Sequence, residues 1–195
     1  MPRPVLVVIG PSACGKSTAV RTLHQRGVVH VHPTWTTRPR RPDESAGSVE
    51  HRFVTDALFD DLEAAGFFLG TVALPGLPYR YALPRVALDD EGPTHTIMAR
   101  AQFVDLFARY FPDRLVYEID DTLERARERL IARGSDAHEI DVRLAGHQEE
   151  IEAGRKISSR SFANAGSLDD LVAAITAALR VDVSASFGQL AVRPS

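Results

Sequence analysis

The stretch Gly10-Pro11-Ser12-Ala13-Cys14-Gly15-Lys16-Ser17, followed by Thr18, decides the fold. It fits the pattern G-x-x-x-x-G-K-[ST], a loop whose backbone amides bind phosphate groups. The five apolar residues before it, Val5 to Ile9, predict a buried parallel strand, and residues 17–25 predict a helix with one apolar side. A strand, this loop and a helix in succession predict a P-loop α/β fold.

The residue types in the loop indicate what each position does. Gly10 and Gly15 let the backbone approach an anion closely, and the free N–H groups and positive dipole end of the helix favour a phosphate there. Lys16 supplies a charge for the β- and γ-phosphates, and Ser17 offers a hydroxyl to Mg²⁺. The predicted ATP-binding residues are Gly10, Ser12, Ala13, Cys14, Gly15, Lys16, Ser17 and Thr18.

The composition is that of one soluble globular domain: 195 residues, 44% hydrophobic and 25% charged. The net charge of −3 gives no basic field for nucleic acid, so any anion recognition is local. The N-terminal apolar run is too short for a signal peptide or a membrane span, and we expect a cytoplasmic protein. The lone Cys14 excludes an internal disulfide. We interpret it as a small residue that fits the loop, with oxidative control of ATP binding as the alternative.

A basic segment, Thr34 to Glu44, follows a second predicted strand at residues 28–32. It holds three arginines in four residues, among prolines, which suits a fixed cluster of donors better than a helix. Arginine matches phosphate geometry and stays charged. With a phosphate loop upstream, we interpret this segment as a second phosphate site, for an acceptor, rather than as a solvated basic turn.

Residues 36–44 are similar to the T-T-R-x-P-R-x-G-E segment of guanylate kinases, which also have a G-P-S-x-x-G-K-S-T loop. Phe53-Val54 and a predicted helix at 56–66 resemble that family's small acceptor-binding subdomain, and the resemblance covers about residues 4 to 180. It implies that Thr34, Arg38 and Arg41 hold the acceptor's phosphate. His51 takes a slot that carries a tyrosine in the family, and Tyr79 stands for a second phosphate-binding tyrosine.

Arg133-Gly134 followed by Arg143-Leu144 resembles the lid of these enzymes, with a lid helix at about 139–153. The resemblance implies that both arginines neutralise the transferring phosphoryl group when the lid closes. The arginines of the preceding predicted helix, at 125, 127 and 129, are interpreted as a solvated face. Asn164 resembles a residue that lies against the adenine of ATP, with a simple turn or cap as the alternative.

The chain departs from the family where the base should bind. After Phe67-Phe68 the family has a glutamate that reads the guanine edge, whereas this chain has Leu69. A leucine cannot accept hydrogen bonds from guanine, so discrimination is lost there. The predicted strand 94–98 leads to Arg100 instead of to an aspartate-rich segment. Three fragments are similar to ribose 1,5-bisphosphate phosphokinase: Arg38-Pro39, Gly76-Leu77-Pro78-Tyr79 and Arg100-Ala101. This similarity implies that Arg100 binds a second acceptor phosphate.

The remaining segments complete the predicted domain. We expect strands at 115–119 and 156–159, a final amphipathic helix ending near residue 180, and a tail, 181–195, that forms an extra strand or is disordered. The predicted core spans 1–33 and 91–180, the acceptor-binding subdomain 34–90 and the lid 134–155. The sheet should have about five parallel strands between helices.

The predicted activity is an ATP- and Mg²⁺-dependent transfer of a γ-phosphoryl group to a small phosphorylated acceptor, with GMP or a related nucleoside monophosphate favoured. No general base is needed because the acceptor oxygen is already anionic, so catalysis falls to Lys16, Arg41, Arg133 and Arg143. The alternatives are a ribose 1,5-bisphosphate phosphokinase and a non-catalytic phospholigand-binding module. We expect a monomer or homodimer with no nucleic-acid or membrane partner.

Overall fold

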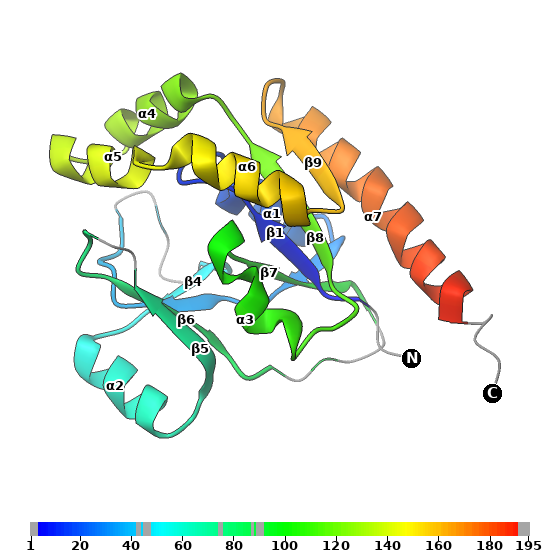
Figure 1. Ribbon diagram of the computed structural model, residues 1–195, viewed down its shortest axis with the longest axis horizontal. Coiled ribbons are helices and arrows are strands. Elements are labelled where there is room, and N and C mark those ends of the chain that lie inside the picture. The colour runs from blue at the N-terminus through cyan, green and yellow to red at the C-terminus, as the bar shows by residue number, and fades with distance from the viewer. Residues whose placement is uncertain are drawn as a thin grey trace.

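A computed structural model of the chain describes residues 4–41, 44, 48–73, 76–86, 88 and 92–190. The described chain forms two sheets flanked by helices (Figure 1). The larger sheet has five parallel strands in the order β2-β7-β1-β8-β9, and the smaller has four in the order β4-β3-β6-β5. The predicted P-loop α/β fold with a five-stranded parallel sheet is confirmed.

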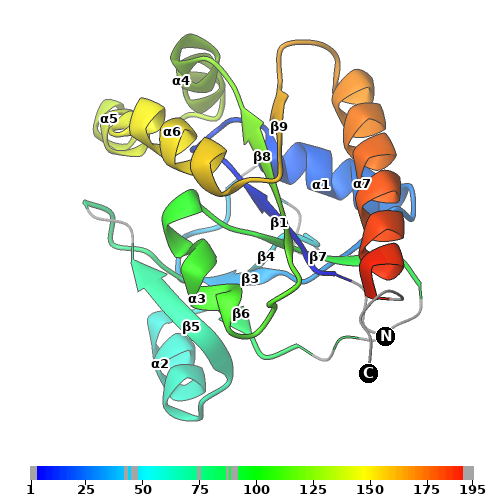
Figure 2. The same ribbon diagram turned by 45° about the vertical axis from the view of Figure 1, so that its right-hand side comes forward.

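The larger sheet forms the core because its strands carry apolar side chains on both faces. On one face, Leu6 and Val8 pack in a cluster with helices α1 and α7; on the other, Val7 and Ile9 pack near η1 and α3. Figure 2 shows α1 and α7 on one side of the sheet and α3 and α6 (His147–Ile157) on the other. Its strands are β1 (Leu6–Ile9), β2 (Val29–Val31), β7 (Thr94–Met98), β8 (Leu115–Asp120) and β9 (Arg160–Ala163), and the helices against it include α1 (Lys16–Gln25), η1 (Ala101–Phe103), α3 (Val104–Ala108) and α7 (Leu168–Leu190).

The smaller sheet begins three residues after β2, so the chain passes directly from one sheet into the other. Strand β3 pairs parallel with β4 and antiparallel with β6, which pairs antiparallel with β5. Helix α2 closes one side of this sheet with the buried Phe59 against Phe68. The elements are β3 (Thr34–Thr36), β4 (His51–Phe53), α2 (Asp56–Ala64), β5 (Phe68–Ala73) and β6 (Arg80–Pro84), all inside the range 34–90. That residues 34–90 form an acceptor-binding subdomain stays a prediction.

The segment predicted to be a lid with one helix at 139–153 contains two helices. They are α5 (Ala137–Leu144) and α6 (His147–Ile157), preceded by α4 (Leu123–Ala132). The chain breaks between them because Gly146 adopts a left-handed conformation with φ of 73°. Thr122 and Asp136 cap α4 and α5 through their side chains.

Two predictions about the C-terminal region are wrong. Residues 156–159 are not a strand: α6 runs to Ile157, and the last strand starts at Arg160, which pairs with Tyr117 of β8. Residues 181–190 continue helix α7, where Asp182 accepts hydrogen bonds from the hydroxyl of Tyr117 and from Arg160. Residues 191–195 lie outside the described part of the chain.

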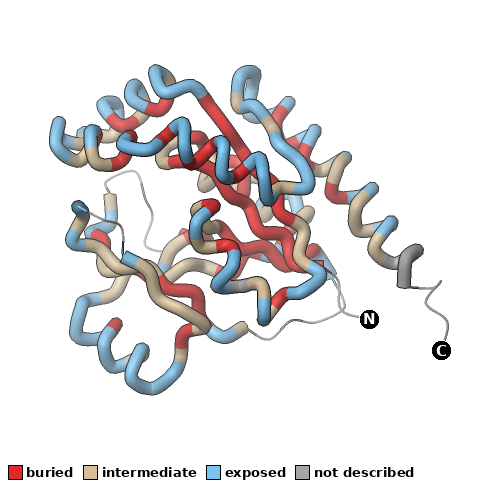
Figure 3. Tube along the Cα trace, in the orientation of Figure 1, coloured by how far each residue is buried: buried red, intermediate tan, exposed pale blue. Residues whose placement is uncertain are grey.

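Burial is concentrated in the three central strands of the larger sheet, β7, β1 and β8, as Figure 3 shows. All four residues of β1 and all five of β7 are buried. Of the helices that the structure describes, none combines the length and the apolar character that crossing a membrane requires.

Candidate active site

The loop at residues 10–17 joins the carboxyl end of β1 to α1, and its backbone requires glycine at two positions. Gly10 has φ of 142°, and a Cβ there would overlap the backbone oxygen of Ile119 on β8. Gly15 has φ of 102°, and a Cβ there would overlap the side-chain amide of Asn164. Any other residue would push the loop off the sheet or off Asn164, so both glycines fix its shape.

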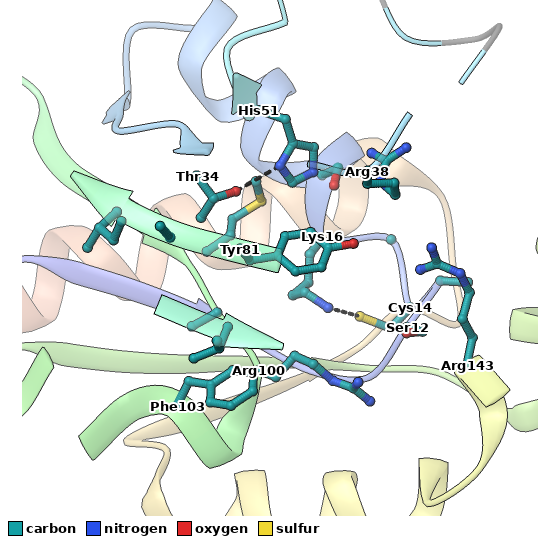
Figure 4. Close-up of a pocket in the computed structure, with 18 of the residues that line it drawn as sticks. Ser12, Cys14, Lys16, Thr34, Arg38, His51, Tyr81, Arg100, Phe103 and Arg143 are labelled. Carbon is teal, nitrogen blue, oxygen red and sulfur yellow. Dashed lines mark hydrogen bonds between the residues drawn. The ribbon is translucent and has the colours of Figure 1, made fainter. Parts of the chain in front are cut away.

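Lys16 and Cys14 lie inside this loop (Figure 4). The Lys16 ammonium donates to the carbonyls of Gly10 at 2.6 Å and Pro11 at 2.8 Å, so its charge is held within the loop. Cys14 is fully buried in the cluster around α1 and α7. Burial raises the pKa of its thiol, although the Lys16 charge opposes this. A buried, protonated thiol is unreactive, which agrees with the packing interpretation of Cys14.

Two side chains hold the loop from outside the pocket. Arg129 on α4 donates to the carbonyl of Ala13 at 2.8 Å and to the buried carboxylate of Asp121. Asn164, just after β9, donates to the carbonyl of Cys14 at 2.9 Å. The prediction of a solvated face is therefore wrong for Arg129. A sequence signal for this role of Arg129 was the acidic pair Asp120-Asp121, because the pair stands at the carboxyl end of a strand, where ligands of α/β sheets bind.

One pocket lies between the loop, the smaller sheet and the lid segment. It brings together most of the predicted site residues: Ser12, Ala13, Cys14, Gly15, Lys16, Ser17, Thr34, Arg38, Arg41, His51, Arg100, Arg133 and Arg143. Gly10, Thr18, Tyr79 and Asn164 are not among its lining residues. The tyrosine that lines it is Tyr81 on β6, which Figure 4 labels among the lining residues and which interacts with Arg38.

The carboxylate of Glu44 fixes the arginines of the basic segment. Arg38, only 4% exposed, donates to both oxygens of Glu44 at 2.7 and 3.0 Å. The backbone N–H of Arg41 donates to the same carboxylate at 2.9 Å. Burial alone would lower the pKa of Arg38, but the hydrogen bonds with Glu44, the charge of Glu44 and the interaction with Tyr81 together outweigh it and raise the pKa. Glu44 therefore sets where both guanidinium groups lie.

Arg41 meets the arginines of the lid segment. Burial and the charges of Arg38, Arg143 and Arg133 lower the pKa of Arg41 to about 10. Arg143 is 7% exposed and donates from Nε to Glu139 at 2.7 Å. Its buried Nη2 has no hydrogen-bond partner within the described part of the chain. Buried donors are nearly always paired, so this group is suited to an anionic ligand.

His51 also faces this cationic end. Its Nδ1 lies 2.7 Å from the hydroxyl oxygen of Thr34 on the neighbouring strand, as Figure 4 shows. Burial, with the charges of Arg38 and Arg41, lowers the pKa of His51 to about 4, although Glu44 and Glu50 oppose this. At neutral pH the imidazole is therefore uncharged, and it can contribute a hydrogen bond but no charge to a bound phosphate.

The other end of the pocket is largely apolar. Arg100 lies there, and its guanidinium is paired with the buried Glu150 of α6 at 2.9 and 3.0 Å. Among the described residues that line the pocket there is no carboxylate. The apolar lining residues of this end are Gly70, Val72, Leu83, Met98, Phe103 and Leu106.

Leu69, which the sequence places at the position of the guanine-reading glutamate, does not line the pocket. Leu69 packs against the cluster of Val7 and Ile9, whereas Gly70 lines the pocket. The pairing of β5 with β6 shifts between Phe68 and Gly70, so the simple alternation of faces fails there. A carboxylate facing the pocket from this part of the strand would have to stand at Gly70.

A P-loop joined to a parallel sheet, with cations converging from the loop, a second sheet and a lid segment, defines a phosphotransferase of the P-loop class. No family model matches the chain. A guanylate kinase of Thermosynechococcus vestitus is 34% identical over 163 residues, which span 78% of this chain and 81% of that protein. A guanylate kinase of Aromatoleum aromaticum is 31% identical over 188 residues, 91% of this chain and 89% of that protein.

The chain belongs to the guanylate kinase family. The crystal structure of guanylate kinase from Anaplasma phagocytophilum has the same fold, with a TM-score of 0.70 and 22% identity, covering 93% of this chain and 86% of that one. Members of the family transfer a phosphoryl group to a phosphate acceptor. The comparisons lend no support to a ribose 1,5-bisphosphate phosphokinase or to a non-catalytic module.

Proposed function

We propose that the protein transfers the γ-phosphoryl group of ATP to the phosphate of a nucleoside monophosphate, with GMP as the favoured acceptor. The observation that carries this proposal is the convergence of Lys16, two arginines of the basic segment, Arg133 at the end of α4 and Arg143 of the lid segment on one pocket. A pocket with this much positive charge suits two phosphorylated ligands in contact, and the names of the relatives favour GMP.

The loop would hold the phosphates of ATP. Its shape depends on Gly10 and Gly15, its inner face includes Ser12 to Ser17, and Thr18 follows on the helix. Asn164 supports the loop from outside, and we propose that it also borders the adenine. Ser17 would be the protein ligand of Mg²⁺, an ion that commonly keeps several waters and binds substrate phosphates as well. Mg²⁺ supplies charge neutralisation on the phosphates.

The basic segment would hold the phosphate of the acceptor. Arg38 is oriented by Glu44, and a fixed guanidinium suits bidentate binding of a phosphate. Thr34 and the uncharged His51 add hydrogen bonds beside it. We propose Tyr81 as the phosphate-binding tyrosine, in the role that the sequence assigned to Tyr79, because Tyr81 lines the pocket.

Arg41, Arg133 and Arg143 would stabilise the phosphoryl group during transfer, together with Lys16. Arg38, Arg133 and Arg143 lie close enough to Arg41 to lower its pKa, so adding an anionic group relieves their mutual repulsion. The buried Nη2 of Arg143 provides a donor for that group. The acceptor oxygen is already an anion, so the side chains need to position and neutralise rather than remove a proton.

A panel of acceptors tests the proposal. ADP release is measured with GMP, AMP, UMP, CMP and ribose 1,5-bisphosphate, using the wild type and Lys16→Ala. We expect turnover with nucleoside monophosphates, highest kcat/KM for GMP, and a loss of about 10³-fold or more in Lys16→Ala. Full activity in Lys16→Ala would contradict the mechanism, and turnover confined to ribose 1,5-bisphosphate would contradict the acceptor.

A further inference from the structure

Three histidines meet at the edge of the larger sheet, on adjacent strands. His30 of β2 and His95 of β7 are register partners, so their side chains leave the same face of the sheet. His32 is two residues beyond His30 and therefore shares that face. Strand alternation places their neighbours Val29 and Val31 in the opposite cluster. His51 does not belong to this group, because it lies in the pocket described above.

The three rings are within reach of a single ion. One nitrogen from each ring lies within 4.8 Å of one from each of the others. The rings of His32 and His95 are stacked, with centroids 5.0 Å apart, and the centroids of His30 and His95 are 5.5 Å apart. Nitrogen ligands at about 2.0–2.1 Å from a tetrahedral zinc lie roughly 3.4 Å apart, so small side-chain rotations suffice.

The burial of the cluster fits a metal centre that is open on one side. His95 and His32 are 6% and 9% exposed, and they share a hydrogen bond of 2.8 Å, so their positions are fixed. His30 is exposed to solvent. Three imidazoles with a fourth, solvent-facing position form a donor set typical of zinc and of other divalent transition metals.

We propose that His30, His32 and His95 form a binding site for one divalent transition-metal ion of the zinc class. The site is separate from the Mg²⁺ and ATP that we assign to the P-loop. An ion that accepts one lone pair from each neutral imidazole takes the place of the hydrogen bond between His32 and His95, and it links strand β2 to strand β7.

The position of the site suggests that it stabilises structure rather than takes part in phosphoryl transfer. His32 lies at the junction between the two sheets, and Thr34, two residues on, begins β3 and lines the pocket. An ion held by β2 and β7 would fix the junction from which the smaller sheet extends.

Metal binding is tested with the full-length, untagged protein after treatment with EDTA. Zn²⁺ is titrated by calorimetry in the presence of excess Mg²⁺ and without nucleotide, and Co²⁺ absorption reports the coordination geometry. We expect one Zn²⁺ per chain, a tetrahedral Co²⁺ spectrum, and a melting temperature that rises with Zn²⁺ concentration because the ion binds the folded state.

His30→Ala is the main variant, since its exposed side chain can be removed with little effect on folding. We expect it to bind Zn²⁺ at least ~10-fold more weakly, because even the loss of a supporting partner of a metal ligand costs that much. His95→Asn should do the same, and circular dichroism checks that both are folded. His138→Ala, at an exposed histidine of α5, is the matched control and should bind as the wild type does.

The proposal is overturned if the wild type binds no Zn²⁺, if folded His30→Ala and His95→Asn bind it as tightly as the wild type, or if His138→Ala weakens binding equally. These readouts do not depend on catalytic activity. Removing Zn²⁺ with EDTA and restoring Mg²⁺ should leave phosphoryl transfer to GMP unchanged.

Discussion

The two ends of the pocket are constructed differently. At the cationic end, Arg38 and Arg143 are each oriented by a nearby carboxylate, Glu44 or Glu139. At the apolar end, aliphatic and aromatic side chains surround the single paired cation Arg100. Fixed donors recognise a phosphate by geometry, whereas an apolar surface recognises a base mainly by shape. Apolar pockets discriminate weakly, so this enzyme should be strict about the phosphate and tolerant about the base.

The largest effect is expected at Arg41. Arg41→Ala should lower kcat/KM by about 10³-fold, since an arginine that neutralises a transferring phosphoryl group contributes that much. The factor should be the same for GMP and AMP, because we propose that the base binds at the apolar end, away from Arg41. Steady-state kinetics with both acceptors measures it, and Arg52→Ala, at an exposed arginine of β4, is the control. A factor that differs strongly between GMP and AMP would contradict the proposal that the cationic end recognises the phosphate and the apolar end recognises the base.

Arg38→Ala should act on acceptor binding. We expect the acceptor KM to rise by about 30-fold, or about 2 kcal/mol, with kcat changed much less. Part of that cost comes from leaving Glu44 without its partner, so the double variant Arg38→Ala/Glu44→Gln should recover part of the lost stability in urea unfolding. If kcat falls while KM stays constant, Arg38 belongs with the transferring group instead.

The apolar end can be changed without disturbing the cationic end. Gly70→Glu places a carboxylate in the pocket, and the added Cβ meets only the Cδ1 of Leu106, at 3.9 Å. We expect the ratio of kcat/KM for GMP over AMP to rise about 10-fold, since guanine offers hydrogen-bond donors that adenine lacks. Gly70→Gln, similar in size but uncharged, should give a smaller rise. An unchanged ratio in Gly70→Glu would show that the base lies elsewhere.

His51 should have the smallest effect, on stability. Its pKa is about 4 in the folded chain and 6.5 ordinarily, so between these values the unfolded chain binds a proton that the folded chain does not. The free energy of unfolding contributed by this group therefore rises as pH increases from about 4 to 6.5. Urea unfolding across this range should show a shallower pH slope for His51→Gln than for the wild type. Equal slopes would mean that burial and the charges of Arg38 and Arg41 do not lower the pKa of His51.

Several site residues were predictable because their signals are local in the sequence. The strand, loop and helix around Lys16 follow from residue type and spacing alone, and the arginines at 38, 41, 133 and 143 stand in short recognisable segments. All five line one pocket in the structure. Arg129 was missed because its spacing on α4 suits an exposed face, whereas its partners Ala13 and Asp121 come from other elements.

Single-residue positions on strands were harder to predict. Side chains alternate between the two faces of a strand, so a shift of one residue moves a side chain from the face that lines the pocket to the face that packs in the core. The irregular pairing after Phe68 places Gly70 in the pocket instead of Leu69, and on β6 the lining tyrosine is Tyr81. The sequence contains no marker for such a shift.

The sequence by itself determined the P-loop, the class of chemistry and which arginines line the pocket, because each depends on contiguous residues. Only the tertiary structure decided which carboxylates orient those arginines, which residue of β5 lines the pocket, and that His95 joins His30 and His32. These depend on strand register and on contacts between segments far apart in the chain, which packing of the whole fold sets.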